Sequence, residues 1–542
     1  MSELFLLNGY AELNLIISLK SAEVLMEIVT VAEMREIERE GFEAGTSYEA
    51  MVDMVGKAVA AEVDRYPRGL RITGLIGKGN NGADTIVALL ELKKRGRAVR
   101  AILIDERKED IYEARLRMGC VPTAALGSAE GGTQVRAFLS ETDMILDGVF
   151  GIGFRPPLPD RCRPLFRMLN ARAFPARIIA VDCVSGMNCD SGETDPDALR
   201  ADQTVAIHAF KLGQLMGSAG AIGGKLSGVR MRLDPELPVY SRIRRRSLTQ
   251  SWVQARLPER CDVSHKGAFG TVRIFGGCEK YFGAPALAAE AAYRSGAGLV
   301  EINSNELVRR CVASRAAEAV WDTISDNAGE NRAALERKLP DRENSAWLVG
   351  PGLGMGNLST TFLDVLFDPE ILGRIRTPIF DADALNYLSD RREILSRLPS
   401  GTILTPHPGE MARLCGCTVA DVNRRRIPLA EEKAREWSAI VVLKGAYTVI
   451  AAPWGETAVA PFANAALAKA GSGDVLSGTI AGFAAQGSDP FSAAQLGVWF
   501  HGSAGEIFRK ERAENRTLLA GEIPGLYSSL FSQIASDYQC VG

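Results

Sequence analysis

Short apolar runs rich in β-branched residues alternate with longer amphipathic stretches along most of this chain, and this alternation restricts its fold more than any other feature. From about Thr30 onward the runs RITGLIG, VRAILI, DMILDGVFG, RIIAVDCVSG and TVAIHAF have the character of strands. Most are apolar nearly throughout, which is typical of strands covered on both faces. The stretches between them are long enough for crossover helices, so the pattern predicts a doubly wound parallel sheet.

A second series of the same kind follows an irregular segment that begins near Pro235. Its predicted strands are GTVRIFGG, LVEIN, SAWLVG, PIFDAD, GTILTP and AIVVLKGAYTVIAAP. A chain of 542 residues is too long for one ordinary core, so two successive α/β domains are the natural interpretation. We expect an N-terminal domain over residues 26–236, a linker over residues 237–254 and a C-terminal domain over residues 255–535.

The first 25 residues lack the periodicity of a domain. We expect them to be a short extension, or Met26 to be the real start of the protein. No apolar run approaches the roughly 20 residues that span a bilayer, and the N-terminus lacks a basic region followed by a small-residue cleavage site. The sequence therefore predicts neither a membrane segment nor a signal peptide.

Charge and cysteine content narrow the functional class. The chain has 63 basic and 66 acidic residues, so its formal net charge is −3. Such a balanced charge does not indicate binding to nucleic acid or to an anionic membrane. The ten cysteines are sparse and show no CxxC spacing, which favours reduced thiols in a cytoplasmic protein. Cys415-Gly416-Cys417 is only a weak metal signal, and with four histidines in the chain a structural zinc site is not expected.

Polar turns follow three of the N-terminal strands, at the edge of a parallel sheet where ligands bind. The first turn, GKGNNGAD, is rich in glycine, which lets backbone N–H groups approach a phosphate closely. Asn81, Asp147 and Ser185 carry the hard oxygen ligands that a cation accepts, and Asp182 is a candidate acid or base. Each turn alone is as readily an ordinary strand-to-helix connection; the three together indicate a site.

One loop of the C-terminal half combines an anion-binding backbone with an acid. Gly471, Ser472 and Gly473 precede Asp474, and apolar residues recur at helical spacing from Val475 onward. Such a loop presents unpaired N–H groups at the positive end of a helix dipole, where phosphate binds. Asp474 itself is either a first-turn acid that complements the dipole or a group with a chemical role.

The turns GKGNNGAD, LDGVFGIG and AVDCVSG, in that order, resemble the signature loops of the NAD(P)H-hydrate epimerase family, whose Rossmann-like domain interconverts the R and S hydrates of NADH and NADPH. The resemblance implies a potassium ion held by Asn81, Asp147 and Ser185, and Asp182 as the catalytic residue. The implied contacts with the hydrate are those of the two glycine loops and the catalytic aspartate: Asn80, Asn81, Gly82, Ala83, Asp84, Gly151, Ile152, Gly153 and Asp182.

The N-terminal half departs from the epimerase pattern at three positions. Ala83 and Thr85 replace glycines, and Val184 replaces the proline before the serine. A methyl group at Ala83 is a small intrusion if the local φ is negative and a costly one if φ is positive. The epimerase activity is therefore a weaker expectation than the fold. Lys211 fits the position of a family lysine that follows a late strand.

The C-terminal half carries a second, longer set of motifs: HKGAFG, GAPALAAEAAYRSGAGLV, GPGLG, DADALN, TPHPGE, LKGAYT and AKAGSGD. The set resembles the ADP- or ATP-dependent NAD(P)H-hydrate dehydratases, which are ribokinase-like, over nearly all of residues 255–535. The resemblance implies Asp474 as the catalytic base. It implies hydrate contacts at Ala284, Gly354, His407 and Asp474, and nucleotide contacts at Lys444, Gly445, Ala446, Tyr447, Thr448, Gly471, Ser472 and Gly473.

Two of these assignments have a structural alternative. His407 either contacts the hydrate or caps the helix that starts near Glu410. Asp381 and Asp383 either orient magnesium or a ribose, or cap the next helix. The sequence alone does not separate these alternatives.

The two resemblances together predict a cofactor-repair enzyme that is both an isomerase and a lyase. We expect NADHX and NADPHX (the hydrates of NADH and NADPH) and ADP or ATP as its small-molecule partners, with magnesium beside the nucleotide and potassium in the epimerase domain. We expect a homo-oligomer, with no nucleic acid and no membrane as partner. The alternatives are a small-molecule kinase in the C-terminal half and a noncatalytic ligand-binding module in the N-terminal half.

Overall fold

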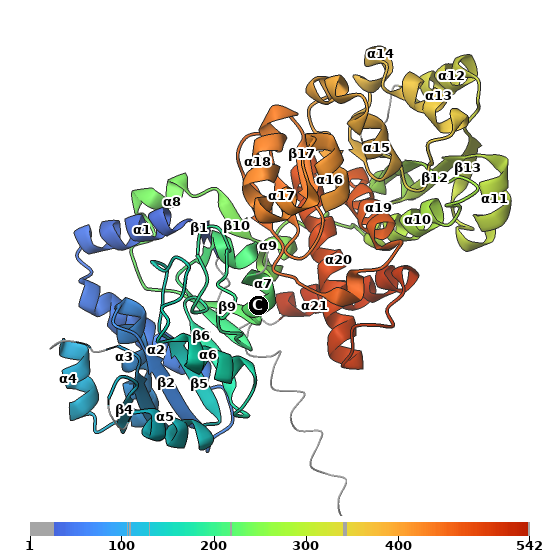
Figure 1. Cartoon of the computed structure of the whole chain (residues 1–542). Helices are drawn as coiled ribbons and strands as arrows, with labels where there is room; N and C mark the ends of the chain where they lie inside the picture. The colour runs from blue at the N-terminus through green and yellow to red at the C-terminus, as the bar shows by residue number, and fades with distance from the viewer. Residues whose placement is uncertain are drawn as a thin grey trace, which may run out of the picture. The chain divides into compact units, whose positions relative to one another are not determined.

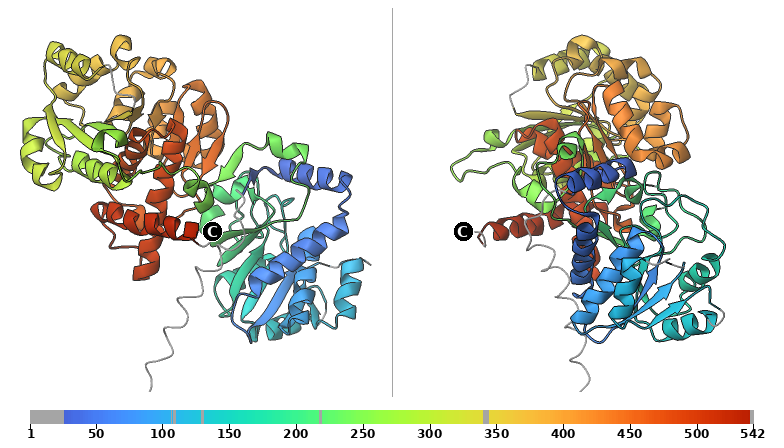
Figure 2. Two further views of the ribbon diagram at one scale, coloured as in Figure 1. Left: turned by 180° about the vertical axis from the view of Figure 1, so that it is seen from behind. Right: turned by 90° about the vertical axis from the view of Figure 1, so that its left-hand side faces the viewer.

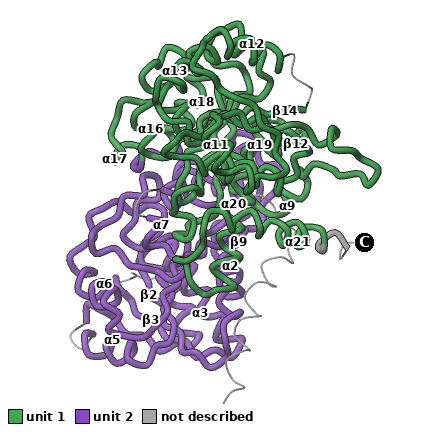
Figure 3. Tube along the Cα trace, turned by 90° about the vertical axis from the view of Figure 1, so that its right-hand side faces the viewer, with its two compact units in different colours: residues 1–25, 246–422, 428–542 green, residues 26–245, 423–427 purple. Residues whose placement is uncertain are grey.

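The structure, a computed structural model, describes residues 26–105, 107, 110–128, 131–216, 219–339 and 344–539. The expectation for residues 1–25 lies outside these ranges. The chain divides into two compact units (Figure 3): residues 26–245 with 423–427, drawn in purple and called the first unit here because it comes first in the sequence, and residues 246–422 with 428–542, drawn in green and called the second unit. Within the described ranges, every helix falls short of the length and apolar character needed to cross a membrane.

The first unit is built on a seven-stranded parallel sheet with the order β4-β3-β2-β5-β6-β7-β9 (Figure 1). Its strands are β2 (Arg71–Ile76), β3 (Ala98–Leu103), β4 (Thr123–Ala125), β5 (Met144–Gly148), β6 (Arg177–Val181), β7 (Gln203–Ile207) and β9 (Lys225–Val229). A separate parallel pair joins β1 (Ile28–Val29) to β8 (Phe210–Lys211). The strand order reverses between β2 and β5, and in such sheets ligands bind at this switch point.

Helices cover both faces of this sheet because its strands are apolar on both sides. Ile72 and Ile76 pack with residues of α2 and α3, whereas Leu75 packs with residues of α5 and α6. The doubly wound, Rossmann-like arrangement predicted from the sequence is therefore confirmed. The helices are α1 (Val31–Glu43), α2 (Tyr48–Val63), α3 (Asn80–Lys94), α4 (Ile111–Met118), α5 (Gly131–Ser140), α6 (Arg163–Asn170), α7 (Ala219–Ile222) and α8 (Pro238–Arg242).

The second unit contains a ten-stranded sheet with the order β10-β19-β18-β17-β16-β15-β14-β11-β12-β13. The strands from β17 to β13 are parallel, while β18 pairs with β17 and β19 in antiparallel fashion. The strands are β10 (Arg245–Ser247), β11 (Thr271–Phe275), β12 (Leu299–Ser304), β13 (Val320–Thr323), β14 (Ser345–Val349), β15 (Pro378–Phe380), β16 (Ile403–Leu404), β17 (Ile440–Leu443), β18 (Val449–Ala451) and β19 (Thr457–Val459). The α/β class predicted for this half is confirmed.

Helices flank this sheet as well (Figure 2). They are α9 (Gln250–Gln254), α10 (Ala284–Ser295), α11 (Glu306–Val312), α12 (Ala328–Lys338), α13 (Asn357–Leu366), α14 (Pro369–Leu372), α15 (Asp383–Ser389), α16 (Pro408–Cys415), α17 (Val419–Arg424), α18 (Arg426–Glu436), α19 (Ser472–Ala485), α20 (Pro490–Arg512) and α21 (Tyr527–Gln539).

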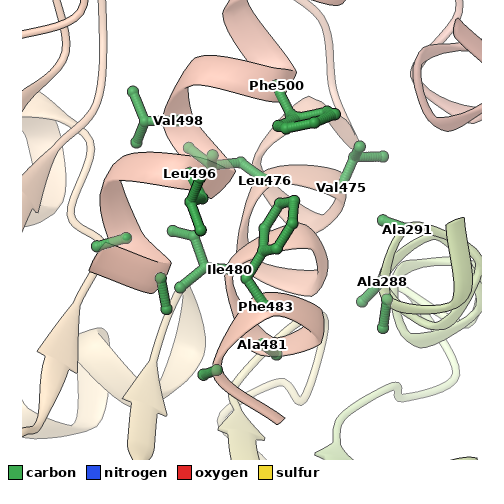
Figure 4. Packing of buried hydrophobic residues seen from close by; sticks show 14 of the residues in the cluster. Ala288, Ala291, Val475, Leu476, Ile480, Ala481, Phe483, Leu496, Val498 and Phe500 are labelled. Carbon is green, nitrogen blue, oxygen red and sulfur yellow. The ribbon is translucent and has the colours of Figure 1, made fainter. Parts of the chain in front are cut away.

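Helix α19 is the central helix of the second unit. It is apolar around most of its circumference, as expected for a helix buried on all sides. Figure 4 shows α10 with Ala288 and Ala291 on one side of it, and α20 with Leu496 and Phe500 on another. The backbones of α10 and α19 meet so closely that a Cβ on Gly478 would lie 2.2 Å from the Ala288 carbonyl oxygen. The start of α19 is therefore held by its neighbours.

Residues 237–254, the predicted linker, contain α8, β10 and α9. The backbone N–H of Leu248 donates to the carbonyl oxygen of Val459, which ties this segment to β19. The segment is ordered because its apolar side chains Val239, Ile243, Leu248, Trp252 and Val253 are all buried. The Arg and Ser residues around them hid this pattern in the sequence.

Candidate active sites

The second unit has a cavity of about 770 Å³ at the start of α19. Its wall comes from the ends of β15 and β17, the start of α16, the loop from Phe462 to Gly473 and the middle of α20. Predicted site residues that line it are His407, Lys444, Gly445, Ala446, Thr448, Gly471, Ser472, Gly473 and Asp474. The strand ends thus bring motifs far apart in sequence into one cavity.

Lys444 pairs with two acidic groups in this cavity. Its Nζ lies 2.6 Å from Oδ1 of Asp381 and 3.7 Å from Oε2 of Glu410. Burial disfavours the charged amine, yet Asp381 and Glu410 together hold the pKa of Lys444 above its ordinary value. A fixed positive charge therefore stands beside the Gly471–Gly473 loop, where a Cβ on Gly473 would lie 3.5 Å from Nζ.

Asp474 has the electrostatic character of a base that works near neutral pH. Burial and then the neighbouring Asp381 raise its carboxyl pKa to about 7, although Lys444 opposes the shift. The pKa of Glu410 is also raised to about 7, mainly by burial. A proton acceptor whose pKa lies near the working pH is well suited to general base catalysis.

The loop before Asp474 leaves two backbone donors open. The N–H of Ser472 donates to the carbonyl oxygen of Lys469, and the N–H of Val475 donates to that of Gly471. Between them, the N–H groups of Gly473 and Asp474 have no partner within the described part of the chain. Gly471 makes this turn possible with φ of 88°. Two open N–H groups beside Lys444 are the kind of donors that bind an anion at a helix N-terminus.

The structure answers part of the question whether His407 caps a helix or contacts a ligand. Nδ1 of His407 accepts hydrogen bonds from the N–H groups of Gly409 and Glu410, so the residue does cap α16. Its ring also lines the cavity and is half exposed, with Nε2 3.3 Å from Oε1 of Glu410. Both ring nitrogens therefore have partners in α16, while the exposed half of the imidazole surface faces the cavity.

Three predicted residues lie outside the lining of this cavity: Ala284, Gly354 and Tyr447. Tyr447 is buried, with its N–H bonded to the carbonyl oxygen of Phe462. The N–H of Gly354 donates to Oδ2 of Asp383 over 2.7 Å. Asp383 is also one of the charges that raise the pKa of Asp474. Asp383 therefore links the Gly354 loop to the cavity.

In the first unit, the turns after β2, β5 and β6 meet at the switch point of the sheet. Asp147 is fully buried and accepts hydrogen bonds from Oγ of Ser185 at 2.6 Å and from the Ser185 N–H at 2.8 Å. Nδ2 of Asn81 donates to the Phe150 carbonyl oxygen, and Ser185 Oγ accepts from the Phe150 N–H. The three residues predicted to hold a cation therefore converge on one loop.

Asn81 leaves one polar atom of this group unsatisfied. Its Oδ1 is buried and has no hydrogen-bond partner among the described residues. Burial raises the pKa of Asp147 to about 6, although its bonds with Ser185 oppose the shift. A buried carbonyl-type oxygen without a donor costs free energy unless a ligand satisfies it. The arrangement of oxygen ligands fits a hard cation.

Asp182 stands beside this group in a left-handed backbone conformation, with φ of 64°. Its Oδ1 accepts from the N–H of Ile207 and forms a buried ion pair with Nζ of Lys211. Lys211 also donates to the carbonyl oxygens of Ile207 and Ala209. This network holds one carboxylate oxygen of Asp182 in place.

Two further carboxyl groups surround Asp182. Burial, followed by the charges of Asp182 and Glu38, raises the pKa of Asp84 well above its usual range. Burial and the charge of Asp182 also raise the pKa of Glu38. Glu38 lies on α1, as does Arg35, whose Nη2 would be 3.7 Å from a Cβ on Gly153. The acidic cluster thus has partners on a helix outside the three turns.

Sequence reasoning missed Arg35, Glu38 and the cavity residue His501. Val31, Arg35 and Glu38 share a face of α1, and Val31 packs against Ile152 and Cys183 of the turns. The helical spacing could have grouped them, but nothing in the sequence says which helix face meets the turns. His501 lies within the long apolar run of α20, where it resembles a buried structural residue.

The fold accommodates Ala83 and Thr85, two of the three departures from the epimerase motif. Ala83 lies inside α3 and has no positive φ, so its methyl group adopts an ordinary helical position. Thr85 is buried, donates to the Asn81 carbonyl oxygen over 2.8 Å and packs against Gly148. Neither side chain disturbs the backbone of the turn.

Comparison with known proteins adds independent evidence. A family described as YjeF-related protein N-terminus matches residues 48–213, and one described as NAD(P)H-hydrate dehydratase matches residues 272–524. A bifunctional NAD(P)H-hydrate repair enzyme of Moorella thermoacetica is 34% identical over 517 residues, which cover 92% of this chain and 95% of that protein. The Escherichia coli enzyme of the same name is 31% identical, covering 88% of each.

Two solved structures are similar to about half of this chain. An ADP/ATP-dependent NAD(P)H-hydrate dehydratase from Bacillus subtilis, co-crystallized with ATP/Mg²⁺, is 32% identical, with a TM-score of 0.46; the match covers 53% of this chain and 98% of that one. A ribokinase-like superfamily protein from Enterococcus faecalis is 24% identical, with a TM-score of 0.46, over 54% of this chain and 96% of that one.

Proposed function

The chain belongs to the bifunctional NAD(P)H-hydrate repair enzymes, and we propose that each of its two units carries one of the two repair steps. The N-terminal domain, residues 26–236, epimerises the R and S hydrates of NADH and NADPH. The C-terminal domain, residues 255–535, dehydrates the S form and consumes ADP or ATP. The two family matches, at residues 48–213 and 272–524, fall inside these ranges and support the assignment.

The dehydration needs an activated leaving group, because hydroxide leaves carbon poorly. Asp474 takes the proton of the hydrate's hydroxyl group, and the oxygen attacks the terminal phosphorus of the nucleotide. Phosphate then leaves as the C–O bond breaks and the ring nitrogen donates its lone pair, and loss of a proton from the neighbouring ring carbon restores NADH or NADPH. The nucleotide is left one phosphoryl group shorter, and the proton passes from Asp474 to solvent.

The cavity stabilises the charge that develops during this transfer. The open N–H groups of Gly473 and Asp474 point to an anion, and the ammonium of Lys444 stands beside them. Magnesium would enter on the nucleotide's phosphate oxygens and supply further positive charge there. The carboxyl groups of Asp381, Glu410 and Asp474 line the cavity and are the oxygen ligands that such an ion could use. Gly445, Ala446 and Thr448 would contact the nucleotide, and His407 the hydrate.

In the epimerase domain, Asp182 is the proposed acid and base of the epimerisation. Its Oδ1 is held by the buried ion pair with Lys211, while burial raises the pKa of the neighbouring Asp84 well above its usual range. A second carboxyl group beside Asp182 suits a reaction that both gives and takes a proton. The turns that hold Asn80 to Asp84 and Gly151 to Gly153 would bind the dinucleotide.

Potassium is part of the proposal for this domain. The buried Oδ1 of Asn81 needs a partner, and Asp147 and Ser185 supply neighbouring oxygens. A bound cation would fix the turns after β2 and β5 against one another. A cytoplasmic location is proposed as well, because the nine cysteines in the described ranges are free thiols, the state that a reducing compartment maintains.

The observation that carries the proposal is Asp474, a carboxyl group with a pKa near 7 at an open helix N-terminus beside Lys444. The test is to supply S-NADHX with magnesium and ADP or ATP, and to measure NADH and inorganic phosphate together. We expect the two products in equal amounts. A stable phosphorylated product without NADH would instead identify a small-molecule kinase.

A further inference from the structure

Ser472 can reach an anion in the cavity only through its side chain. Its backbone N–H already donates to the carbonyl oxygen of Lys469, unlike the open N–H groups of Gly473 and Asp474. Its Oγ lies 3.0 Å from Nε2 of His501. Both residues line the cavity and are more than nine-tenths buried. The hydroxyl is therefore held by the imidazole at the edge of the anion site.

His501 is well placed to act as a fixed, neutral partner. It lies on α20, next to Phe500, which packs against α19 (Figure 4). Burial lowers the pKa of His501 to about 4; the nearby Ser472 backbone opposes this shift, and the charge of Lys444 adds to it. The ring is thus uncharged near neutral pH and carries a single N–H.

We propose that His501 is a positioning residue that donates from Nε2 to Ser472 Oγ and so turns the serine hydroxyl proton toward the transferred phosphoryl group. A hydroxyl has one donor hydrogen and accepts through its lone pairs. When the imidazole occupies the acceptor side, the serine proton is free for another acceptor, and the neighbouring Gly473 and Asp474 N–H groups indicate where that anion sits. The inference rests on the proposed dehydratase function and adds a third donor to its anion site.

Substitutions of Ser472 and His501 distinguish the proposed positioning role of His501 from a purely structural one. In the full-length protein, Ser472→Ala and His501→Asn are each expected to lower the kcat of NADH formation by roughly tenfold to a hundredfold, the effect of losing one hydrogen bond to a charged group. The KM values for S-NADHX and nucleotide should change little. His501→Gln should retain most activity, because its side-chain N–H reaches the Nε2 position, whereas the Asn amide matches Nδ1.

The double variant Ser472→Ala/His501→Asn provides the decisive comparison. If His501 acts through Ser472, the double variant is no slower than the slower single variant. Multiplicative losses would overturn the proposal, as would His501→Asn within threefold of the wild type, or His501→Gln as slow as His501→Asn. Should His501→Asn fail to fold, Ser472→Ala and His501→Gln carry the test: Ser472→Ala within threefold of the wild type, or His501→Gln as slow as Ser472→Ala, would overturn the proposal. Asp474→Asn, measured in parallel, separates a failure of this proposal from a failure of the dehydratase assignment.

Discussion

Nζ of Lys444 and Oδ1 of Asp381 lie 2.6 Å apart at the ends of two parallel strands, and this ion pair stands directly beside the loop that carries Asp474. The pair places one positive and one negative charge next to the proposed base. Asp381 raises the pKa of Asp474 and Lys444 lowers it. The pKa of Asp474 therefore depends on two opposing charges, and a substitution of either neighbour should shift it.

The first prediction concerns the pH dependence of dehydration. Asp474 accepts a proton only when ionised, so kcat/KM should rise with pH up to about 7 and then level off. Asp381→Asn removes a charge that raises the pKa of Asp474 and releases Lys444 from its partner; both changes should move the profile to lower pH. The measurement is kcat/KM for S-NADHX between pH 5 and 9.

Glu410 supplies the control for this profile, because its own pKa is also raised to about 7. In Glu410→Gln the rising limb should remain. A flat profile in that variant would assign the titration to Glu410 and contradict the role given to Asp474.

The second prediction concerns the first glycine turn. A Cβ on Gly82 would lie 2.0 Å from the Gly77 carbonyl oxygen, whereas a Cβ on Gly79 would meet no atom within 4 Å. Gly82→Ala should therefore displace the start of α3 and destabilise the protein by about 1–3 kcal/mol. Gly79→Ala, whose φ of −89° suits alanine, should leave stability nearly unchanged. Equal melting temperatures for the two variants, measured by circular dichroism, would contradict this packing.

The third prediction concerns potassium. Epimerisation should be fastest with potassium and slow down when the ion is replaced by lithium, because Asn81, Asp147 and Ser185 would lose their shared cation. The readout is consumption of R-NADHX in the presence of excess dehydratase activity. Asn81→Asp adds a charged oxygen at the same position and should weaken the preference for potassium over lithium. An equal rate in both salts would argue against a cation at Asn81.

Much of the architecture could be predicted because the strands are apolar on both faces. Runs such as RIIAVDCVSG leave little choice besides a buried parallel strand, and the polar residues after them meet at one sheet edge as predicted. The loop before Asp474 was recognisable for a similar reason, since glycine, serine and glycine ahead of an apolar helix indicate an open N-terminus.

Other parts of the sites depend on packing between distant elements. Glu38 and Arg35 belong to a helix with an ordinary charged face, and only the contact of Val31 with Ile152 shows which side meets the turns. His501 is hidden in an apolar helix, and its partner Ser472 is 29 residues away in sequence. The effect of Ala83 could not be predicted either, because it depended on a backbone angle.

The most direct test of the central claim is absorbance at 340 nm with Asp474→Asn. Wild-type protein and this variant each receive an R/S mixture of NADHX with magnesium, potassium and ADP or ATP. We predict full conversion by the wild type, after subtraction of spontaneous epimerisation, and a rate lower by about 10²–10⁴-fold in the variant, as expected for loss of a general base. An Asp474→Asn variant that restores NADH at the wild-type rate would contradict the account.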